Sequence, residues 1–388
     1  MKKVIFISAL AIAAAVSCTK SDIVDTKFNE AISFETYTGR DAQTKAAVTN
    51  NGNIRSVGII GYYTGAANWN DGKTPGSTPT PANLMDNTNL TSTNGTTWTY
   101  SPAKYWTNDT DKYTFLAYAP YVSSETGATN PVGLTIKSKA PATLSYEVPE
   151  VIPSQSDILY AFNPKTGDDN VNTLIDMTKG EGSVTLGFKH ALSRLTVKAT
   201  ADDSDFKFDV KKVAISGNFI KKGDLDLATG TWSNATPATE DITYVFYTKA
   251  SETGTVVKYA ADNTVVEKFA ALTDKAQALT SVNYAEMNNE ANYLMVIPVG
   301  ASAHTAVLTV DYTTYYNGQE SGLNTKTFEV TNDFVKGNAY AINLNFMLDE
   351  NNQITFDVTV ADWNMVNPEQ TEYPEGEPEE SVTPGEGE

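Results

Sequence analysis

Cysteine and histidine are scarce in this chain, whose 388 residues include one cysteine, Cys18, and two histidines. Because a lone cysteine has no partner within its own chain, no internal disulfide can form, and burial and hydrogen bonding must stabilise the fold. His190 and His304 have no carboxylate at a spacing typical of metal ligands, so a structural role is expected for both. We therefore expect neither a metal nor a cofactor.

Catalytic signatures are missing as well. The sequence contains no G-x-S-x-G elbow, P-loop, dinucleotide-binding fingerprint or H-E-x-x-H motif. Pairs of aspartates lie in turn-like stretches, where Asp accepts backbone hydrogen bonds, and none has the ligand spacing of a calcium loop. These pairs are Asp109 and Asp111, Asp202 and Asp203, and Asp224 and Asp226. The sequence predicts a structural or binding protein and no enzyme, with a hydrolase built from scattered carboxylates as an alternative.

Positive charge is in short supply. The chain has 28 Lys and Arg against 47 Asp and Glu, which gives a formal net charge of −19. A surface that binds nucleic acid or anionic lipid is basic, so neither is an expected partner. Residues 368–388 carry eight Glu and no Lys or Arg. Like-charge repulsion and the lack of apolar groups predict that this segment is a disordered acidic tail.

The N-terminus has the pattern of an export signal. Lys2 and Lys3 precede an apolar run over residues 4–16, which is too short to span a bilayer. Ser17 and Cys18 follow, an arrangement that resembles a bacterial lipobox. We expect residues 1–17 to be a signal peptide and Cys18 to be acylated, with acyl chains anchoring the protein to a membrane. The alternative is an ordinary secreted protein in which the cysteine has no such role.

The rest of the chain has the composition of a β protein, with 20 Tyr and 15 Phe. Alternating apolar residues over 340–348 and 354–360 predict two half-buried antiparallel strands. In residues 105–121 one face carries Tyr113 and Phe115 and the other Leu116 and Tyr118, which predicts a strand covered on both sides. Further strands are expected at residues 31–37, 57–63, 157–162, 183–188, 192–199, 206–215, 242–247, 293–299 and 306–316. A helix is expected only at 268–287.

Length and composition predict two domains. The polar run 201–205 is the expected junction, which places an N-terminal domain at residues 46–200 and a C-terminal domain at 201–367. Residues 64–97 form a long insertion rich in Gly, Pro, Thr and Asn, and loops of that length are usually functional or disordered. Short strands with frequent turn residues predict an all-β sandwich architecture.

Several stretches, taken in order, resemble the fimbrillin family, the lipoprotein subunits of type V pili in Bacteroides-type bacteria. They are the lipobox, AISFETY followed by GRDAQTKAAV, VGIIGYY, YWTNDTDKYTFLAYAPY, LGFKHALSRLTVKA, FVKGNAYAINLNF and ITFDVTVADW. The resemblance implies two tandem transthyretin-like β-sandwich domains. It also implies a lipoprotein of the outer membrane that becomes a subunit of a cell-surface fimbrium and contributes to adhesion.

In this family an arginine-specific protease removes the lipidated N-terminal piece together with its first strand, and another subunit donates a strand to the vacated groove. Residues 18–45 would then be the tether and removable strand, with Ile32 and Phe34 pointing inward and Ser33 and Glu35 facing solvent. Arg40 is the expected cleavage site and Lys45 the alternative. The partners would be the protease and other fimbrial subunits, either copies of this chain or related chains.

A second reading is a surface-anchored lipoprotein that binds glycans or proteins and does not polymerise. Exposed tryptophans can stack on sugar rings, and Trp69, Trp98, Trp106 and Trp232 are the candidates. The first strand distinguishes the two readings, because a pilin needs it to be removable and a glycan-binding protein does not.

Overall fold

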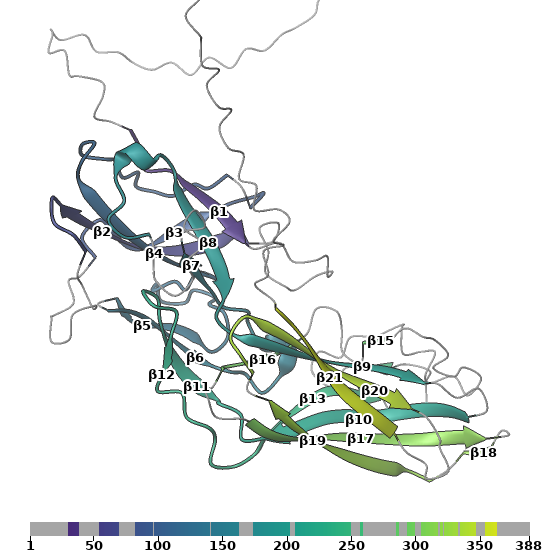
Figure 1. Cartoon of the computed structure of the whole chain (residues 1–388). Coiled ribbons are helices and arrows are strands. Elements are labelled where there is room, and N and C mark those ends of the chain that lie inside the picture. Colours follow the sequence, from purple (N-terminus) through teal and green to yellow (C-terminus); the bar gives the residue numbers. More distant parts are fainter. Residues whose placement is uncertain are drawn as a thin grey trace, which may run out of the picture.

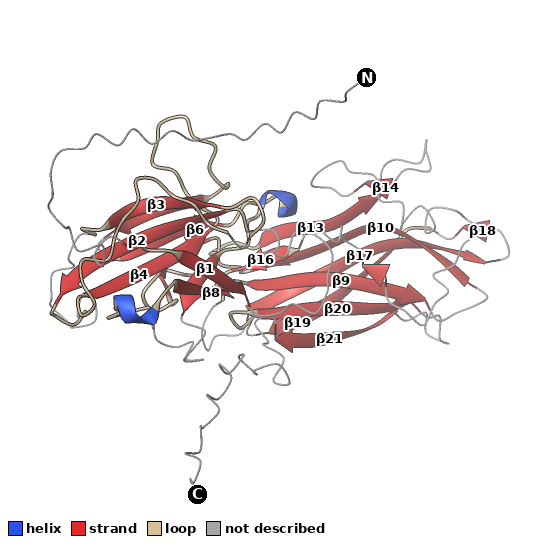
Figure 2. Ribbon diagram, turned by 90° about the horizontal axis from the view of Figure 1, so that it is seen from above, coloured by secondary structure: helices blue, strands red, loops and turns tan. Residues whose placement is uncertain are grey.

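The structure is a computed structural model. It describes residues 30–38, 54–69, 82–95, 97–139, 141–162, 174–201, 206–249, 257–258, 285–286, 293–298, 304–316, 319–320, 322–332, 334–346 and 354–362. Cys18, Arg40, Lys45 and the acidic tail lie outside these residues. The described part is almost entirely β-structure, with two one-turn 3₁₀ helices, η2 (Ile152–Ser154) and η3 (Lys179–Glu181) (Figure 2). The predicted all-β class is confirmed.

A six-stranded sheet forms one end of the molecule (Figure 1). Its order is β1 (Phe34–Thr38), β8 (Val184–His190), β7 (Leu159–Phe162), β4 (Lys112–Ala119), β2 (Ser56–Gly65) and β3 (Met85–Thr91). The first strand, β1, lies at an edge and runs parallel to β8, whereas the other neighbouring strands are antiparallel. Its position at an edge means that β1 can leave without separating any other pair of strands.

Strand β4 is covered on both faces, as the sequence predicts. Tyr113 and Phe115 lie in a smaller apolar core that also contains Phe34 of β1 and three residues of β8, Val184, Leu186 and Phe188. Leu116 and Tyr118, on the opposite face, lie in a larger core that extends into the second half of the chain. The six-stranded sheet therefore separates two cores, and β1 contributes to the smaller one.

Three further sheets complete the described fold (Figure 1). The first contains β12 (Trp232–Ser233), β11 (Lys222–Asp226), β6 (Ala142–Glu147) and β5 (Leu134–Lys139), in that order. The second contains β14 (Val257–Lys258), β13 (Ile242–Lys249), β10 (Phe206–Gly217), β17 (His304–Tyr316) and β18 (Gln319–Glu320), with β19 (Asn324–Asn332) paired to β17. The third contains β15 (Ala285–Glu286), β9 (Ser193–Ala201), β20 (Asn338–Phe346) and β21 (Ile354–Asp362), with β16 (Leu294–Val296) paired to β9.

Most expected strands are present, and the two alternating segments near the end form an antiparallel hairpin, β20 and β21. Within β20 the expected inward residues Tyr340, Ile342, Leu344 and Phe346 are buried. One expectation is wrong, because the insertion 64–97 contains a strand, β3, which pairs with β2. The expected helix 268–287 lies outside the described residues except for Ala285 and Glu286, which form β15 and pair with β9.

Sheet membership does not follow the expected boundary at residues 200 and 201. Strand β9 precedes that boundary, yet it runs parallel to β20 over eight residue pairs and is antiparallel to β16. Strand β11 follows the boundary and pairs with β6. The larger core is likewise continuous, from Tyr118 in the first half to Phe346 in the second. A division into two domains stays a prediction, and its boundary has to accommodate these crossing strands.

A buried polar pair lies where β7 and β8 meet. The ring Nδ1 of His190 lies 2.9 Å from Oδ2 and 3.1 Å from Oδ1 of Asp157, and both side chains are buried. His190 is the last residue of β8, which pairs with β7 along one edge and with β1 along the other. The hydrogen-bonded pair thus holds the end of β8 against the residues that lead into β7.

Replacing Asp157 with Ala should lower the free energy of unfolding by about 1–3 kcal/mol, because a buried hydrogen-bond acceptor is lost. Urea denaturation measures this. The matched control is Glu150→Gln, which breaks a solvent-exposed pair with Lys221 at 2.9 Å and should leave stability nearly unchanged. Equal midpoints for both variants would contradict a structural role for the buried pair.

Candidate functional site

The backbone of residues 30–38 is held from two sides. On one side β1 pairs in parallel with β8, from Phe34 opposite Val184 to Thr38 opposite Phe188. Just before this ladder, the carbonyl of Ser33 accepts from Val184 N at 2.9 Å. On the other side Ile32 N donates to the carbonyl of Lys104 at 2.8 Å, and the carbonyl of Glu30 accepts from Trp106 N at 3.1 Å. These contacts use main-chain atoms, so any extended segment can make them.

The side chains of β1 alternate as expected. Ile32 is 1% and Phe34 5% exposed, whereas Ser33 and Glu35 face solvent. The Phe34 ring packs edge-on against Phe115 and Tyr100, with centroid distances of 5.5 and 5.7 Å. The inward direction of Ile32 and Phe34 is therefore confirmed. The two side chains fill an apolar cavity that would open to water without β1.

Segment 98–106 closes over this cavity. The hydroxyl of Tyr100 donates to the carbonyl of Ile32 at 2.8 Å. Burial raises the pKa of Tyr100 further above neutrality, and the protonated phenol is the donor of this hydrogen bond. Trp98 reaches the same strand, because its Nε1 donates to Oγ1 of Thr36 at 3.1 Å. We call the surface made by β8 and segment 92–106 the β1 seat.

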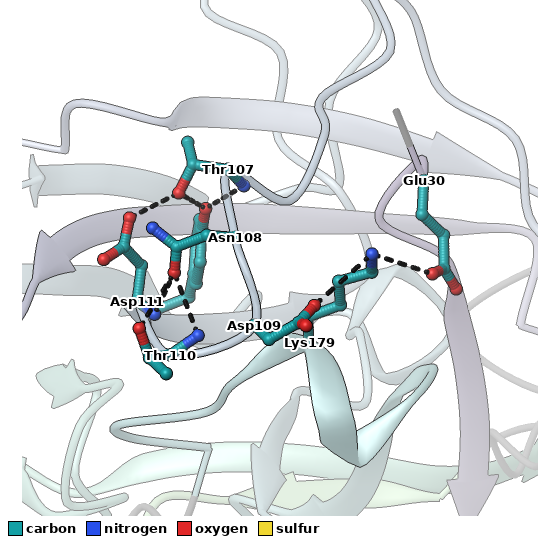
Figure 3. Close-up of polar contacts among 8 residues, drawn as sticks. Glu30, Thr107, Asn108, Asp109, Thr110, Asp111 and Lys179 are labelled. Carbon is teal, nitrogen blue, oxygen red and sulfur yellow. Dashed lines mark hydrogen bonds and ion pairs between the residues drawn. The ribbon is translucent and has the colours of Figure 1, made fainter. Parts of the chain in front are cut away.

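A polar rim lies beside the residues that lead into β1 (Figure 3). Lys179 Nζ lies 3.7 Å from Glu30 Oε2 and 3.5 Å from Asp109 Oδ1. In the same turn Asp111 accepts from Thr107 Oγ1 at 2.5 Å (Figure 3). It also accepts from Tyr63 OH at 2.7 Å. Hydrogen bonding, above all from Thr107, lowers the pKa of Asp111. The rim fixes the turn 107–111 beside the seat, but exposed ion pairs of this kind contribute little to stability.

The tryptophans that are candidates for glycan binding make contacts within the protein. Trp106 and Trp69 are buried, and Trp232 Nε1 donates to the carbonyl of Ala191 at 2.7 Å. Trp98 is half-buried and contacts β1. All four rings are thus buried or half-buried, which is the commoner case for aromatic residues in a β-sandwich, and the alternative of sugar stacking gains no support from them.

A polar cleft of about 1200 Å³ lies over β6 and β11. Lys137 forms an ion pair with Asp224, and Asn234 Nδ2 donates to the same carboxylate at 2.6 Å. Burial of Asp224 opposes ionisation, but these hydrogen bonds outweigh it and lower its pKa. The lining side chains that the structure describes include no aromatic ring. The cleft therefore lacks the stacking platform that the glycan reading requires.

Among the described residues, no group of three or more His, Cys, Asp or Glu side chains is placed to hold a metal ion. Within the same residues no helix is long and apolar enough to cross a membrane.

The sequence predicted the buried residues of β1 but missed the residues that receive them. No sequence motif singles out Tyr100 or Gly95, and the sequence suggests Trp98 only as a candidate for stacking on sugars. The available signal was the density of aromatic residues between 98 and 115, which is typical of a core contact. This density of aromatic residues does not identify the segment that they contact, because β1 lies about sixty residues earlier in the chain.

A sequence model of the fimbrillin-like family matches residues 44–363, most of the chain. The chain belongs to this family. A curated relative, the fimbrium subunit Fim1C of Phocaeicola vulgatus, is 29% identical over 210 residues, which are 51% of each protein. The chain thus spans about half the length of the curated relative it matches.

The fold also resembles a solved structure, a fimbrial protein from Bacteroides vulgatus, with a TM-score of 0.61 and 20% identity. The alignment covers 86% of this chain and 100% of the other. At that identity the likeness shows a shared fold. Together with the family match it agrees with the β-sandwich architecture that the sequence predicts.

Replacing Phe34 with Ala should destabilise the protein by about 3 kcal/mol, since a buried aromatic ring is lost and a cavity remains. Thermal unfolding measures the change. Glu35→Ala is the matched control, because the neighbouring side chain is exposed and its loss should leave the midpoint nearly unaltered. If both variants melted at the wild-type temperature, β1 would not be an integral part of the fold.

Proposed function

We propose that the chain is a subunit of a cell-surface fimbrium, exported as a lipoprotein and assembled by β-strand exchange after proteolysis. The observation that carries this proposal is the β1 seat. A strand at the edge of a sheet fills an apolar cavity with Ile32 and Phe34, and a main-chain ladder joins it to β8. Such a strand can be replaced by another of similar pattern.

The order of the N-terminal segments supports the same sequence of events. Residues 1–17 direct export, Cys18 carries the lipid to the outer membrane, and β1 follows it in the chain. Strand β1 ends at Thr38, two residues before Arg40. Cleavage after Arg40 by an arginine-specific protease would separate β1 and the lipid from the rest of the protein, with Lys45 marking the alternative position.

Loss of β1 would create the driving force for assembly. The main-chain groups of β8 that face β1 would be unpaired, and the cavity of Ile32 and Phe34 would be exposed to water. Both changes are unfavourable, and a strand from another subunit relieves both. Since the donor and acceptor surfaces differ, the contact is heterologous and does not close on two copies, so a filament results. Until cleavage, the chain's own β1 blocks assembly.

A donor strand is available in a second copy of the chain. Strand β21 lies at an edge of its sheet, where β20 is its neighbour. Residues 354–357 read Ile-Thr-Phe-Asp, and residues 32–35 read Ile-Ser-Phe-Glu. The two apolar residues are identical, and a hydroxyl and an acid are kept at the positions between and after them. The subunits that exchange strands are therefore copies of this chain or related fimbrial subunits.

Digestion of the purified, non-lipidated chain with an arginine-specific protease tests the proposal. We expect a new N-terminus at Asp41 and a ladder of multimers that resists SDS without heating. Sequencing separates this cut from one after Arg55, which would give Ser56. The Arg40→Ala variant should stay monomeric, and Arg40→Ala with Lys45→Arg should regain cleavage and assembly. Cleavage at Arg40 that leaves only monomers would contradict assembly by strand exchange.

A further inference from the structure

The inward face of β1 presents three side chains to the seat, and they are not alike. Ile32 and Phe34 are apolar and buried among apolar groups. Thr36, two residues further along the same face, is half-buried and meets polar groups instead. The seat thus offers two apolar positions and one polar position at a spacing of two residues.

One hydroxyl satisfies two groups of the seat. Thr36 Oγ1 donates to the carbonyl of Gly95 at 3.0 Å and accepts from Trp98 Nε1 at 3.1 Å. A hydroxyl is both donor and acceptor, so Thr or Ser can make both bonds. Valine has nearly the shape of threonine, but it can make neither bond, and a partly buried donor and acceptor would lose their partner.

The loop that supplies these groups is fixed by its own hydrogen bonds. Gly95 N donates to Ser92 Oγ at 2.8 Å, and Thr97 N donates to Asn94 Oδ1 at 2.8 Å. Gly95 has a φ of +79°, a conformation that suits glycine. The Gly95 carbonyl therefore points to the position of Thr36 without rearrangement. This geometry discriminates between side chains, unlike the main-chain ladder.

We infer that the β1 seat selects its incoming strand by a pattern of three alternate residues, aliphatic, aromatic and hydroxyl. The occupant is a strand of another fimbrial subunit that runs parallel to β8 and carries Ser or Thr two residues after an aromatic residue. This inference rests on the proposed function and names the partner that its groove fits. Thr36 occupies the position that determines specificity, and its hydroxyl is bound by Trp98 Nε1 and the Gly95 carbonyl.

By this pattern β21 of a second copy is a weaker occupant. When residues 354–357 are aligned with 32–35, Val358 takes the position of Thr36. Ile354 and Phe356 fit the two apolar positions, but Val358 offers no hydroxyl to Trp98 or Gly95. A related subunit with Thr or Ser at this position is favoured over a copy of the same chain.

Peptide displacement tests the inference on the full, non-lipidated chain. A site for a protease that does not recognise arginine is inserted between Arg40 and Asp41, and the only cysteine, Cys18, is labelled with a fluorophore. At a protein concentration low enough that exchange between copies is slow, β1 stays in its seat after cleavage. Unlabelled peptides added in excess then compete with it, and gel filtration follows the released label. The peptides are residues 29–38 with the native sequence or with Thr36→Ser, Thr36→Val or Glu35→Gln, and residues 351–360 with the native sequence or with Val358→Thr.

We expect Thr36→Val to weaken displacement about tenfold and Val358→Thr to strengthen it about tenfold. Thr36→Ser and Glu35→Gln, which keep the hydroxyl, should stay within about threefold of the native peptide. In a Trp98→Phe protein the difference between the native peptide and its Thr36→Val variant should shrink, which a general effect of peptide stability would not cause. Equal displacement by these two peptides on the wild-type protein would overturn the inference and leave strand exchange standing. Failure of every peptide to release β1 would overturn both.

Discussion

The pairing of β1 with β8, completed by the burial of Ile32 and Phe34, is the contact on which the proposed function depends. Its main-chain part is indifferent to sequence, and its buried side chains lie on one face of a short edge strand. Such a contact is strong enough to order the segment and simple enough for a different strand to reproduce. Covalent continuity with the rest of the chain gives β1 a high effective concentration at its seat, which cleavage would remove.

The division of the interior into two cores makes the loss of β1 tolerable. Ile32 and Phe34 lie in the smaller core, on one face of the six-stranded sheet. The larger core lies on the opposite face and joins that sheet to the second half of the chain, where β9 and β20 cross the expected boundary. In the proposed assembly, removal of β1 would open the smaller core and leave the larger core covered, so the subunit could keep its shape until a donor strand binds.

Much of this arrangement follows from the sequence, and the parts that do not have a common cause. Alternation predicted the buried residues of β1 and β20 and the two covered faces of β4, because strand periodicity is a local property. The pairing of β9 with β20, the strand β3 within a polar insertion, and the contact of Trp98 with Thr36 depend on segments distant in the chain. No local pattern identifies such partners, because an aromatic residue is compatible with a buried contact and with an exposed one. For the same reason the β1 seat cannot be predicted from the sequence, since segment 92–106 and β1 become neighbours only in the folded chain.

A reversible lock on β1 tests the central claim most directly. The hydroxyls of Ser33 and Ser183 lie 2.8 Å apart, so Ser33→Cys with Ser183→Cys, in a Cys18→Ser background, places two thiols for a disulfide across the seat. After digestion with the arginine-specific protease, the oxidised protein should retain its N-terminal fragment and stay monomeric. Reduction should release the fragment and allow SDS-resistant multimers to form. Multimers that form equally well with the disulfide closed would contradict the claim that assembly requires a vacant β1 seat.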